Sequence, residues 1–208
     1  MGRYIGPKNK IARRFGMNLG LKTNPAKVAR RLSQLPGVHG PKKRSGGASS
    51  TFGKQLLEKQ KAKYIFGIRE AQLSRYVKEA TRLTGDSGIN LQKLFEFRLD
   101  NVVYRLGFAT TRAQARQFVT HNMFLVNGKR MNIPSYQVRV GDVVTIKESK
   151  QKKKLFEGME EKLAQVQLPS WLSLEPSKKM GKVLSMPLKD DFEKAFDVGM
   201  IVEYYSTR

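Results

Sequence analysis

The sequence predicts an α+β fold. A mainly helical domain carries a basic, partly extended N-terminal arm and is joined to a small module of two helices and a short antiparallel sheet. Apolar residues recur at helical spacing between residues 52 and 106. Asn127-Gly128 between apolar stretches is typical of a two-residue β-hairpin. The first 57 residues hold 13 cations and no acid. We therefore expect an arm over residues 1–50, a helical domain over 51–97 completed by 155–208, and the module over 98–154 between them.

The arm is rich in Gly, Pro and Ser as well as in Lys and Arg. Such a composition buries too little apolar surface to offset its ordering entropy, so we expect the arm to order against a partner. Two alternatives are an organellar transit peptide and a solvated charged tail; the turn-rich sequence makes a poor amphipathic helix. Tyr4, Phe15 and Phe52 either stack on bases or pin the arm to its own domain, and both readings stay open.

The helical domain is predicted from two periodic segments and a C-terminal part. Helices are expected over 52–65 and 68–83, separated by Gly67, with a loop over 85–88. Residues 155–166 have helical spacing. Trp171 is expected to anchor a core or an interface. Residues 200–205 are interpreted as a short strand or packing segment that ties the C-terminus to the helical domain.

The module begins with an amphipathic helix from Leu91 to Leu106, which Gly107 ends. Thr111 has capping-box spacing to Gln114 at the start of a second helix. Arg112 and Arg116 lie four residues apart, and therefore on one side of that helix. His121 follows at its end, where it is either an RNA contact or a helix cap. The hairpin and a turn at residues 141–142 complete the small sheet.

Charge restricts the function classes. The 208 residues carry a formal net charge of +23 and a pI near 10.4, which attracts polyanions and makes nucleic acid the first candidate partner. No apolar stretch approaches the roughly 20 residues of a spanning helix. The chain has no cysteine and two histidines, and it contains no Ser-His-Asp pattern, metal-ligand cluster or glycine-rich phosphate loop. We therefore expect no membrane, no cofactor, no bound metal and no enzymatic activity.

Several blocks of sequence carry a family resemblance. They include Gly2-Arg3-Tyr4, Arg98-Leu99-Asp100-Asn101-Val102-Val103-Tyr104-Arg105-Leu106-Gly107-Phe108, residues 6–8, 36–40, 53–61, 111–112, 115–117, 126–128, 132–136 and 141–142, and Ile201-Val202-Glu203-Tyr204-Tyr205-Ser206. Taken in order, these blocks resemble a family of bacterial ribosomal proteins, the fourth of the small-subunit series. The resemblance covers nearly the whole chain. Some relatives hold zinc through N-terminal cysteines, which are absent here. Phe52 stands where tyrosine is usual, and Phe97 where arginine is common.

The resemblance implies a cytoplasmic, ribosome-bound protein that binds small-subunit ribosomal RNA early in assembly, at a multi-helix junction of the 5′ domain. It also implies a position near the messenger RNA entrance beside other ribosomal proteins. Messenger RNA is a further candidate partner, and translational accuracy a candidate effect. The predicted RNA contacts are Arg3, Tyr4, Lys8, Lys10, Arg13, Arg14, His39, Lys42, Lys43, Arg44, Lys54, Lys59, Lys61, Lys63, Arg69, Arg98, Arg105, Arg112, Arg116, His121, Lys129 and Arg130.

Two other functions remain as alternatives. The first is an RNA-modifying or tRNA-handling enzyme, because similar modules occur in such proteins and Arg98-Leu99-Asp100 resembles the catalytic aspartate motif of some pseudouridine synthases. We interpret the motif here as structural, with Asp100 paired to a nearby cation, since no separate base-binding domain accompanies it. The second is a free regulatory RNA binder that represses its own messenger, which is compatible with the ribosomal role.

Overall fold

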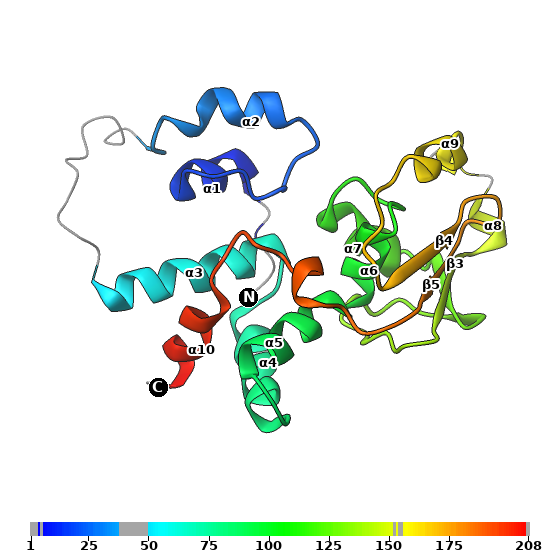
Figure 1. Cartoon of the computed structure of the whole chain (residues 1–208). Coiled ribbons are helices and arrows are strands. Elements are labelled where there is room, and N and C mark those ends of the chain that lie inside the picture. The colour runs from blue at the N-terminus through cyan, green and yellow to red at the C-terminus, as the bar shows by residue number, and fades with distance from the viewer. Residues whose placement is uncertain (1–3, 5, 38–49, 152, 154–155, 207–208) are drawn as a thin grey trace. The chain divides into compact units, whose positions relative to one another are not determined.

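The computed structural model describes residues 4, 6–37, 50–151, 153 and 156–206, and the chain divides into two compact units (Figure 1). The helical unit comprises residues 1–91 and 193–208, and the sheet unit comprises residues 92–192. Helices dominate, and one small antiparallel sheet is present, which confirms the predicted fold class. Among the helices of the described residues, none is both long enough and apolar enough to cross a membrane.

The helical unit contains α1 (Lys8–Phe15), α2 (Pro25–Leu32), α3 (Thr51–Ile65), α4 (Glu70–Arg82), α10 (Val198–Ser206) and the first half of α5 (Ser87–Glu96). The predicted helices over 52–65 and 68–83 are thereby confirmed as α3 and α4. The Ser50 hydroxyl begins α3 by accepting a hydrogen bond from the Gly53 N–H at 3.2 Å. Asp86 begins α5 in the same way, accepting from the Gly88 and Ile89 N–H groups.

The C-terminal segment returns to α3 as a helix. Figure 1 shows α10 beside α3. The Phe52 ring stacks on Tyr204 with 5.6 Å between ring centroids, and the buried Ile201 and Tyr204 lie three residues apart on one helical face. The prediction of a packing segment is therefore confirmed, and the strand alternative is wrong.

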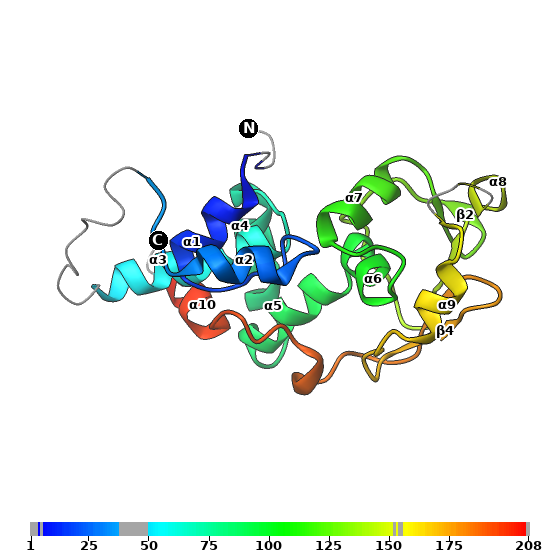
Figure 2. The same cartoon turned by 90° about the horizontal axis from the view of Figure 1, so that it is seen from above.

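The described part of the arm contains two helices, joined by a segment without regular secondary structure. Helices α1 and α2 lie side by side (Figure 2). The two helices and the loop between them bury the side chains of Ile11, Ala12, Leu19 and Val28. Apolar residues are few in this stretch, but at helical spacing they suffice to cover one another and α3. The arm thus contains two helices that pack within the chain, and the expectation that it orders against a partner stays a prediction.

The aromatic residues of the arm pack on its own domain. Tyr4 meets Tyr64 of α3 edge-on at 5.7 Å, and Phe15 meets the same ring at 6.0 Å. Together with the stacking of Phe52 on Tyr204, these contacts favour pinning over base stacking.

The sheet unit contains α6 (Leu99–Arg105), α7 (Arg112–Thr120), α8 (Glu148–Gln151), α9 (Met159–Ala164), a 3-10 helix (Lys189–Asp191), β1 (Phe124–Val126), β2 (Lys129–Arg130), β3 (Val143–Ile146), β4 (Leu172–Glu175) and β5 (Met180–Val183). The five strands form one antiparallel sheet in the order β2-β1-β3-β5-β4. Asn127 and Gly128 both have positive φ, at 50° and 76°, as a type I′ turn requires. The predicted hairpin is confirmed.

Residues 155–192 belong to the sheet unit, so the predicted boundary of the helical domain is wrong for this segment. Strand β5 pairs with the edge of β3 that β1 leaves open, and β4 pairs with β5. Trp171 is fully buried in the core of this unit, with Phe97 edge-on at 5.6 Å. Only residues 193–208 return to the helical unit. Of the helix predicted over 155–166, the structure forms α9 alone as α-helix; residue 155 lies outside the described residues.

The single helix predicted from Leu91 to Leu106 is two helices, α5 and α6. Arg98 between them is extended, with φ −64° and ψ 134°. The Phe97 carbonyl accepts from the Val138 N–H at 2.8 Å, and the Leu99 N–H donates to the Tyr136 carbonyl at 2.9 Å. These partners lie about 40 residues away along the chain. The local spacing of apolar residues therefore does not predict the break between α5 and α6.

An ion cluster on Glu70 joins α4 to α3 and α10. One Glu70 carboxylate oxygen accepts from Lys59 Nζ at 2.7 Å and from the Tyr205 hydroxyl at 2.6 Å, and the other accepts from Lys63 Nζ at 3.1 Å. Partial burial raises the pKa of Glu70, but the hydrogen bonds from Lys59, Tyr205 and Lys63 outweigh it and lower the pKa to about 2.

We expect Glu70→Gln to lower the free energy of unfolding at pH 7 by about 1 kcal/mol, a modest value because 44% of the side chain is exposed. A depressed pKa stabilises the fold above the ordinary value of 4.5, and that contribution is lost as the pH falls through about 2. Urea denaturation should show the difference from the parent shrinking between pH 5 and pH 2. Glu79→Gln, at an exposed position on α4, is the control. A difference that did not change with pH would contradict this assignment.

Candidate nucleic-acid interface

A buried carboxylate, Asp100 in the first turn of α6, holds two arginines. Asp100 accepts from Arg98 Nε at 3.0 Å and Arg98 Nη2 at 2.7 Å, and from Arg116 Nη1 at 3.1 Å. Arg98 is fully buried and the Asp100 side chain is 5% exposed, whereas that of Arg116, on α7, is 25% exposed. The pairing of Asp100 with nearby cations that the sequence predicted is therefore confirmed.

A second buried carboxylate, Glu96 at the end of α5, organises the other side of the cluster. It accepts from Arg105 Nη2 at 2.8 Å and Nε at 3.0 Å, and from Asn101 Nδ2 at 2.7 Å. The Asn101 side-chain oxygen in turn accepts from Arg112 Nε at 2.8 Å. The Arg112 guanidinium also lies over the Tyr104 ring, 4.7 Å from its centroid.

These contacts make an arginine cluster, by which we mean Arg98, Arg105, Arg112 and Arg116. Four guanidinium groups against the carboxylates of Glu96 and Asp100 leave a net charge of +2. Arg105, Arg112 and Arg116 keep part of their surface exposed. Because their side chains are already held in place, an anion that binds them does not have to immobilise them first. Guanidinium groups suit phosphate oxygens in particular, through paired N–H donors.

The β1–β2 hairpin presents further exposed cations at the edge of the sheet. Lys129 and Arg130 are exposed on β2. Their turn is fixed by Asn127, whose side-chain N–H donates to Asp142 at 2.7 Å and whose side-chain oxygen accepts from the Val143 N–H at 2.9 Å. His121 is exposed at the C-terminus of α7, where its backbone N–H bonds the Gln117 carbonyl.

The predicted contacts on α1 divide into exposed and structural side chains. Lys10 and Arg14 are exposed, and Lys8 is half-buried. Arg13 instead donates to the Gln34 and Leu35 carbonyls at 2.6 and 2.8 Å, which ties α1 to the segment after α2.

The predicted contacts on α3 are largely paired with acids. Lys59 and Lys63 pair with Glu70, and Lys61 pairs with Glu58 at 2.6 Å. Three further predicted contacts are exposed, which are Lys54 on α3 and Tyr4 and Arg69 outside this helix. The predictions for Arg3, His39, Lys42, Lys43 and Arg44 lie outside the described residues.

Burial corrects two of the predicted contacts. The Arg98 guanidinium is completely buried on Asp100, and the Lys59 side chain is 5% exposed and bonded to Glu70. Both cations are covered by the protein and already bound to a carboxylate, which favours a structural role for each of them. Conversely, the prediction omitted the exposed cations of two helices, which are Lys27, Arg30 and Arg31 of α2 and Arg75, Lys78 and Arg82 of α4. The spacing of each group along its helix is the signal that would have found them.

The same geometry bears on catalysis and on metals. The Asp100 carboxylate is buried and engaged by two arginines, which is unsuitable for an aspartate that must reach a flipped base. Within the described residues, no three or more His, Asp or Glu side chains are placed to hold a metal ion.

Comparison with known proteins agrees with this division of the chain. Residues 3–96 match the family described as ribosomal protein S4/S9 N-terminal domain, and residues 97–144 match the S4 domain. The second match ends inside β3, so β4 and β5 lie beyond it. The S4-domain match and the arginine cluster together define the class: the chain is an RNA-binding protein with an S4 domain.

The relatives identify the family. The small ribosomal subunit protein uS4 of Roseiflexus castenholzii is 46% identical over 208 residues, and those of Paraburkholderia xenovorans and Albidiferax ferrireducens are 47% and 44% identical over 210 residues. Each alignment covers 99% of this chain and 100% of the relative. The chain belongs to the uS4 family of small ribosomal subunit proteins. This is a family of structural proteins, so the chain is not an enzyme, as the sequence predicted.

We expect Asp100→Asn to reduce the free energy of unfolding by about 3 kcal/mol, because it leaves the buried Arg98 charge without a counter-charge. Urea denaturation at pH 7 measures the loss. Asp190→Asn, at an exposed position of the same unit, should stay within about 0.5 kcal/mol of the parent. Equal stability of the two variants would show that Asp100 is not the support of the arginine cluster.

Proposed function

We propose that this chain is a structural constituent of the small ribosomal subunit that binds small-subunit ribosomal RNA directly. In this proposal it binds at a multi-helix junction of the 5′ domain and nucleates assembly there. The proposal is supported by membership of the uS4 family, whose members carry the name small ribosomal subunit protein.

The observation that carries the proposal is the arginine cluster with its partly exposed Arg105, Arg112 and Arg116. An RNA duplex hides its base edges in a narrow major groove, so proteins recognise it through shape, phosphates and 2′-hydroxyls. A rigid set of guanidinium groups on α6 and α7 is suited to that mode of recognition. Lys129 and Arg130 extend the cationic surface of the same unit.

A junction binder has to contact more than one RNA helix. Both units carry exposed cations of their own, on α1, α2 and α4 in the helical unit and on β2 in the sheet unit, where α7 adds two partly exposed arginines. One chain can therefore neutralise phosphates on strands that would otherwise repel one another where helices converge.

Family membership also supports the finer assignments, which belong to the same proposal. We place the protein on cytoplasmic ribosomes, beside other small-subunit proteins and near the messenger RNA entrance, where it influences decoding accuracy. Repression of its own messenger is compatible with this role. These assignments do not depend on the arginine cluster. Sedimentation with small subunits and misreading assays test them separately.

The main test is hydroxyl-radical footprinting of the full chain on small-subunit ribosomal RNA at several salt concentrations. Protection should cluster at one multi-helix junction and should be lost steeply as salt rises, because each neutralised phosphate releases counterions. Scattered protection, or binding that does not respond to salt, would overturn the proposal.

We expect the double variant Lys129→Gln, Arg130→Gln to bind this RNA about tenfold more weakly and to reduce the slope of log affinity against log salt by about two. Both side chains are exposed, so the free energy of unfolding should not change. Filter binding measures the affinity. The matched control is Lys162→Gln, Lys178→Gln, which removes two exposed cations of the same unit that lie beside acidic residues. An equal loss in both variants would mean that net charge, and not the hairpin, is responsible.

A further inference from the structure

We propose that α4 carries a second RNA-backbone site, formed by Arg75, Lys78 and Arg82 and called here the α4 stripe. Its ligand is the phosphodiester backbone of an RNA duplex. The inference rests on the proposed function and extends it, because it assigns an RNA contact to a helix that neither the sequence prediction nor the family comparison singles out for binding.

The stripe is a straight row on the outer side of α4. Successive residues of an α-helix are rotated by about 100°, so positions 75, 78 and 82 fall within an arc of about 60°. The buried residues of α4, which are Leu73, Tyr76, Val77 and Ala80, lie on the opposite side. All three stripe side chains are exposed. At about 1.5 Å per residue the row is about 10 Å long, which allows contact with more than one phosphate.

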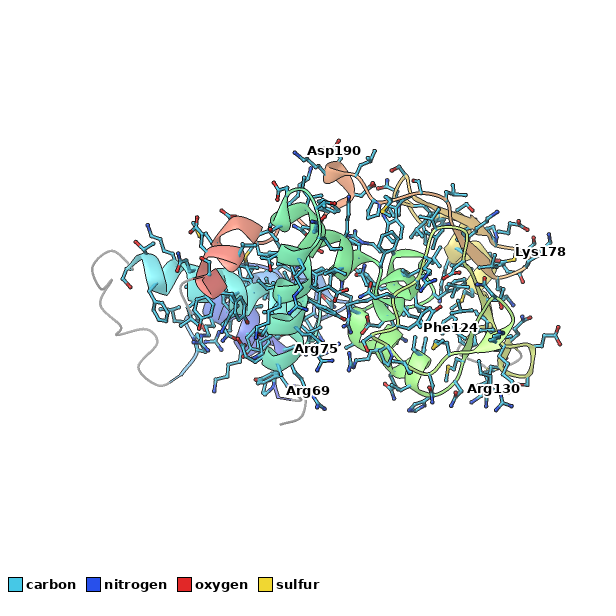
Figure 3. All side chains as sticks on the ribbon, turned by 90° about the horizontal axis from the view of Figure 1, so that it is seen from below. Arg69, Arg75, Phe124, Arg130, Lys178 and Asp190 are labelled. Atoms are coloured by element: carbon cyan, nitrogen blue, oxygen red, sulfur yellow. The ribbon has the colours of Figure 1, made fainter. Side chains whose placement is uncertain are left out.

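Two of the three carboxylates on α4 and the loop after it are engaged away from the stripe. Glu70 is occupied by Lys59, Lys63 and Tyr205, and the Asp86 carboxylate caps α5. Glu79, the remaining acid of α4, follows Arg75 by four residues and borders one edge of the row, but among the described residues it forms no ion pair with the stripe. Within the part of the chain that the structure describes, the stripe cations form no ion pair. Figure 3 shows Arg75 and the exposed Arg69 along the same flank of the helical unit.

The contrast with α3 is the central observation. Lys59, Lys61 and Lys63 have carboxylate oxygens at 2.7, 2.6 and 3.1 Å, so a phosphate must compete with an existing partner for each of them. A stripe cation loses only water and diffuse counterions when it meets RNA, and counterion release favours binding. Of these two helices, α4 therefore presents three exposed cations in one row, whereas α3 presents only Lys54 as an exposed cation.

The composition of the outer side favours RNA over an acidic protein. Protein interfaces have an apolar, aromatic-rich centre with a polar rim, whereas the outer side of α4 places Ala71, Ser74 and Glu79 beside its three cations and no large apolar residue among them. Leu83, which is 49% exposed, is the C-cap residue and lies outside the stripe. Lysine and arginine without an apolar centre are what contact with a phosphate backbone requires.

The first test compares two triple variants of the full chain on small-subunit ribosomal RNA. Arg75→Gln, Lys78→Gln, Arg82→Gln should reduce the slope of log affinity against log salt by about three and weaken binding at least tenfold. In footprints, protection of one RNA helix should be lost while the protection due to the arginine cluster persists. The control, Lys162→Gln, Lys178→Gln, Lys189→Gln, removes the same charge from exposed positions near acids. It should leave slope and footprint almost unchanged. Circular dichroism verifies that both variants are folded.

The second test places a probe on the stripe itself. The chain has no cysteine, so Ala71→Cys, at an exposed position on the row, gives a single attachment point for a tethered Fe–EDTA group. Directed hydroxyl-radical cleavage should fall on a short set of nucleotides inside the RNA helix that loses protection in the stripe variant. Ser177→Cys, in the exposed turn between β4 and β5, is the control and should cleave elsewhere or not at all.

The outcomes separate this inference from the proposed function. Specific binding by the parent, with an unchanged slope in the stripe variant and no cleavage from position 71, would overturn the α4 stripe and leave the ribosomal role intact. A stripe that bound an acidic protein and not RNA would give the same result and would also overturn the inference. Absence of specific RNA binding by the parent would overturn both proposals.

Discussion

Two buried carboxylates, on Glu96 and Asp100, are the constraint on which the arginine cluster depends. Arginine side chains on a surface lose conformational freedom when they bind, and that cost opposes affinity. Here the cost is met during folding, because Asp100 holds Arg116 and Glu96 holds Arg105. The arrangement requires Arg98 as a buried counter-charge beneath Asp100. A motif that resembles a catalytic triplet in other RNA proteins is used in this fold to position cations.

The same principle explains why abundance of charge is a poor guide to binding residues. The chain has 40 cations and 17 acids, but the acids are not distributed evenly around the cations. Glu58 and Glu70 pair with three lysines of α3, whereas Arg75, Lys78 and Arg82 of α4 form no ion pair within the described residues. Helices with similar basic content therefore differ in what they can offer to RNA. Lys59 is structural for this reason, although in the sequence it is indistinguishable from its neighbours.

The sheet illustrates how distant residues complete a local module. Strands β1 and β3 leave one edge open, and β5 and β4 close it with residues 172–183. Leu172 and Val183 are buried in the same core as Trp171. The predicted boundary at residue 154 falls inside this unit. The sequence suggested it because the linker there is polar and the strands that follow are only four residues long.

The sequence by itself determined the features that depend on neighbours along the chain. Helices α3, α4 and α7, the Thr111 cap and the Asn127-Gly128 turn all follow from spacing or from a conformation that few residues adopt. It also determined the charge and the family resemblance. The tertiary structure alone decided where α5 ends, which unit holds residues 155–192, and which cations remain exposed. Those features depend on hydrogen bonds and ion pairs between residues far apart in sequence, such as Val138 with Phe97 and Arg116 with Asp100. No local pattern records such partners.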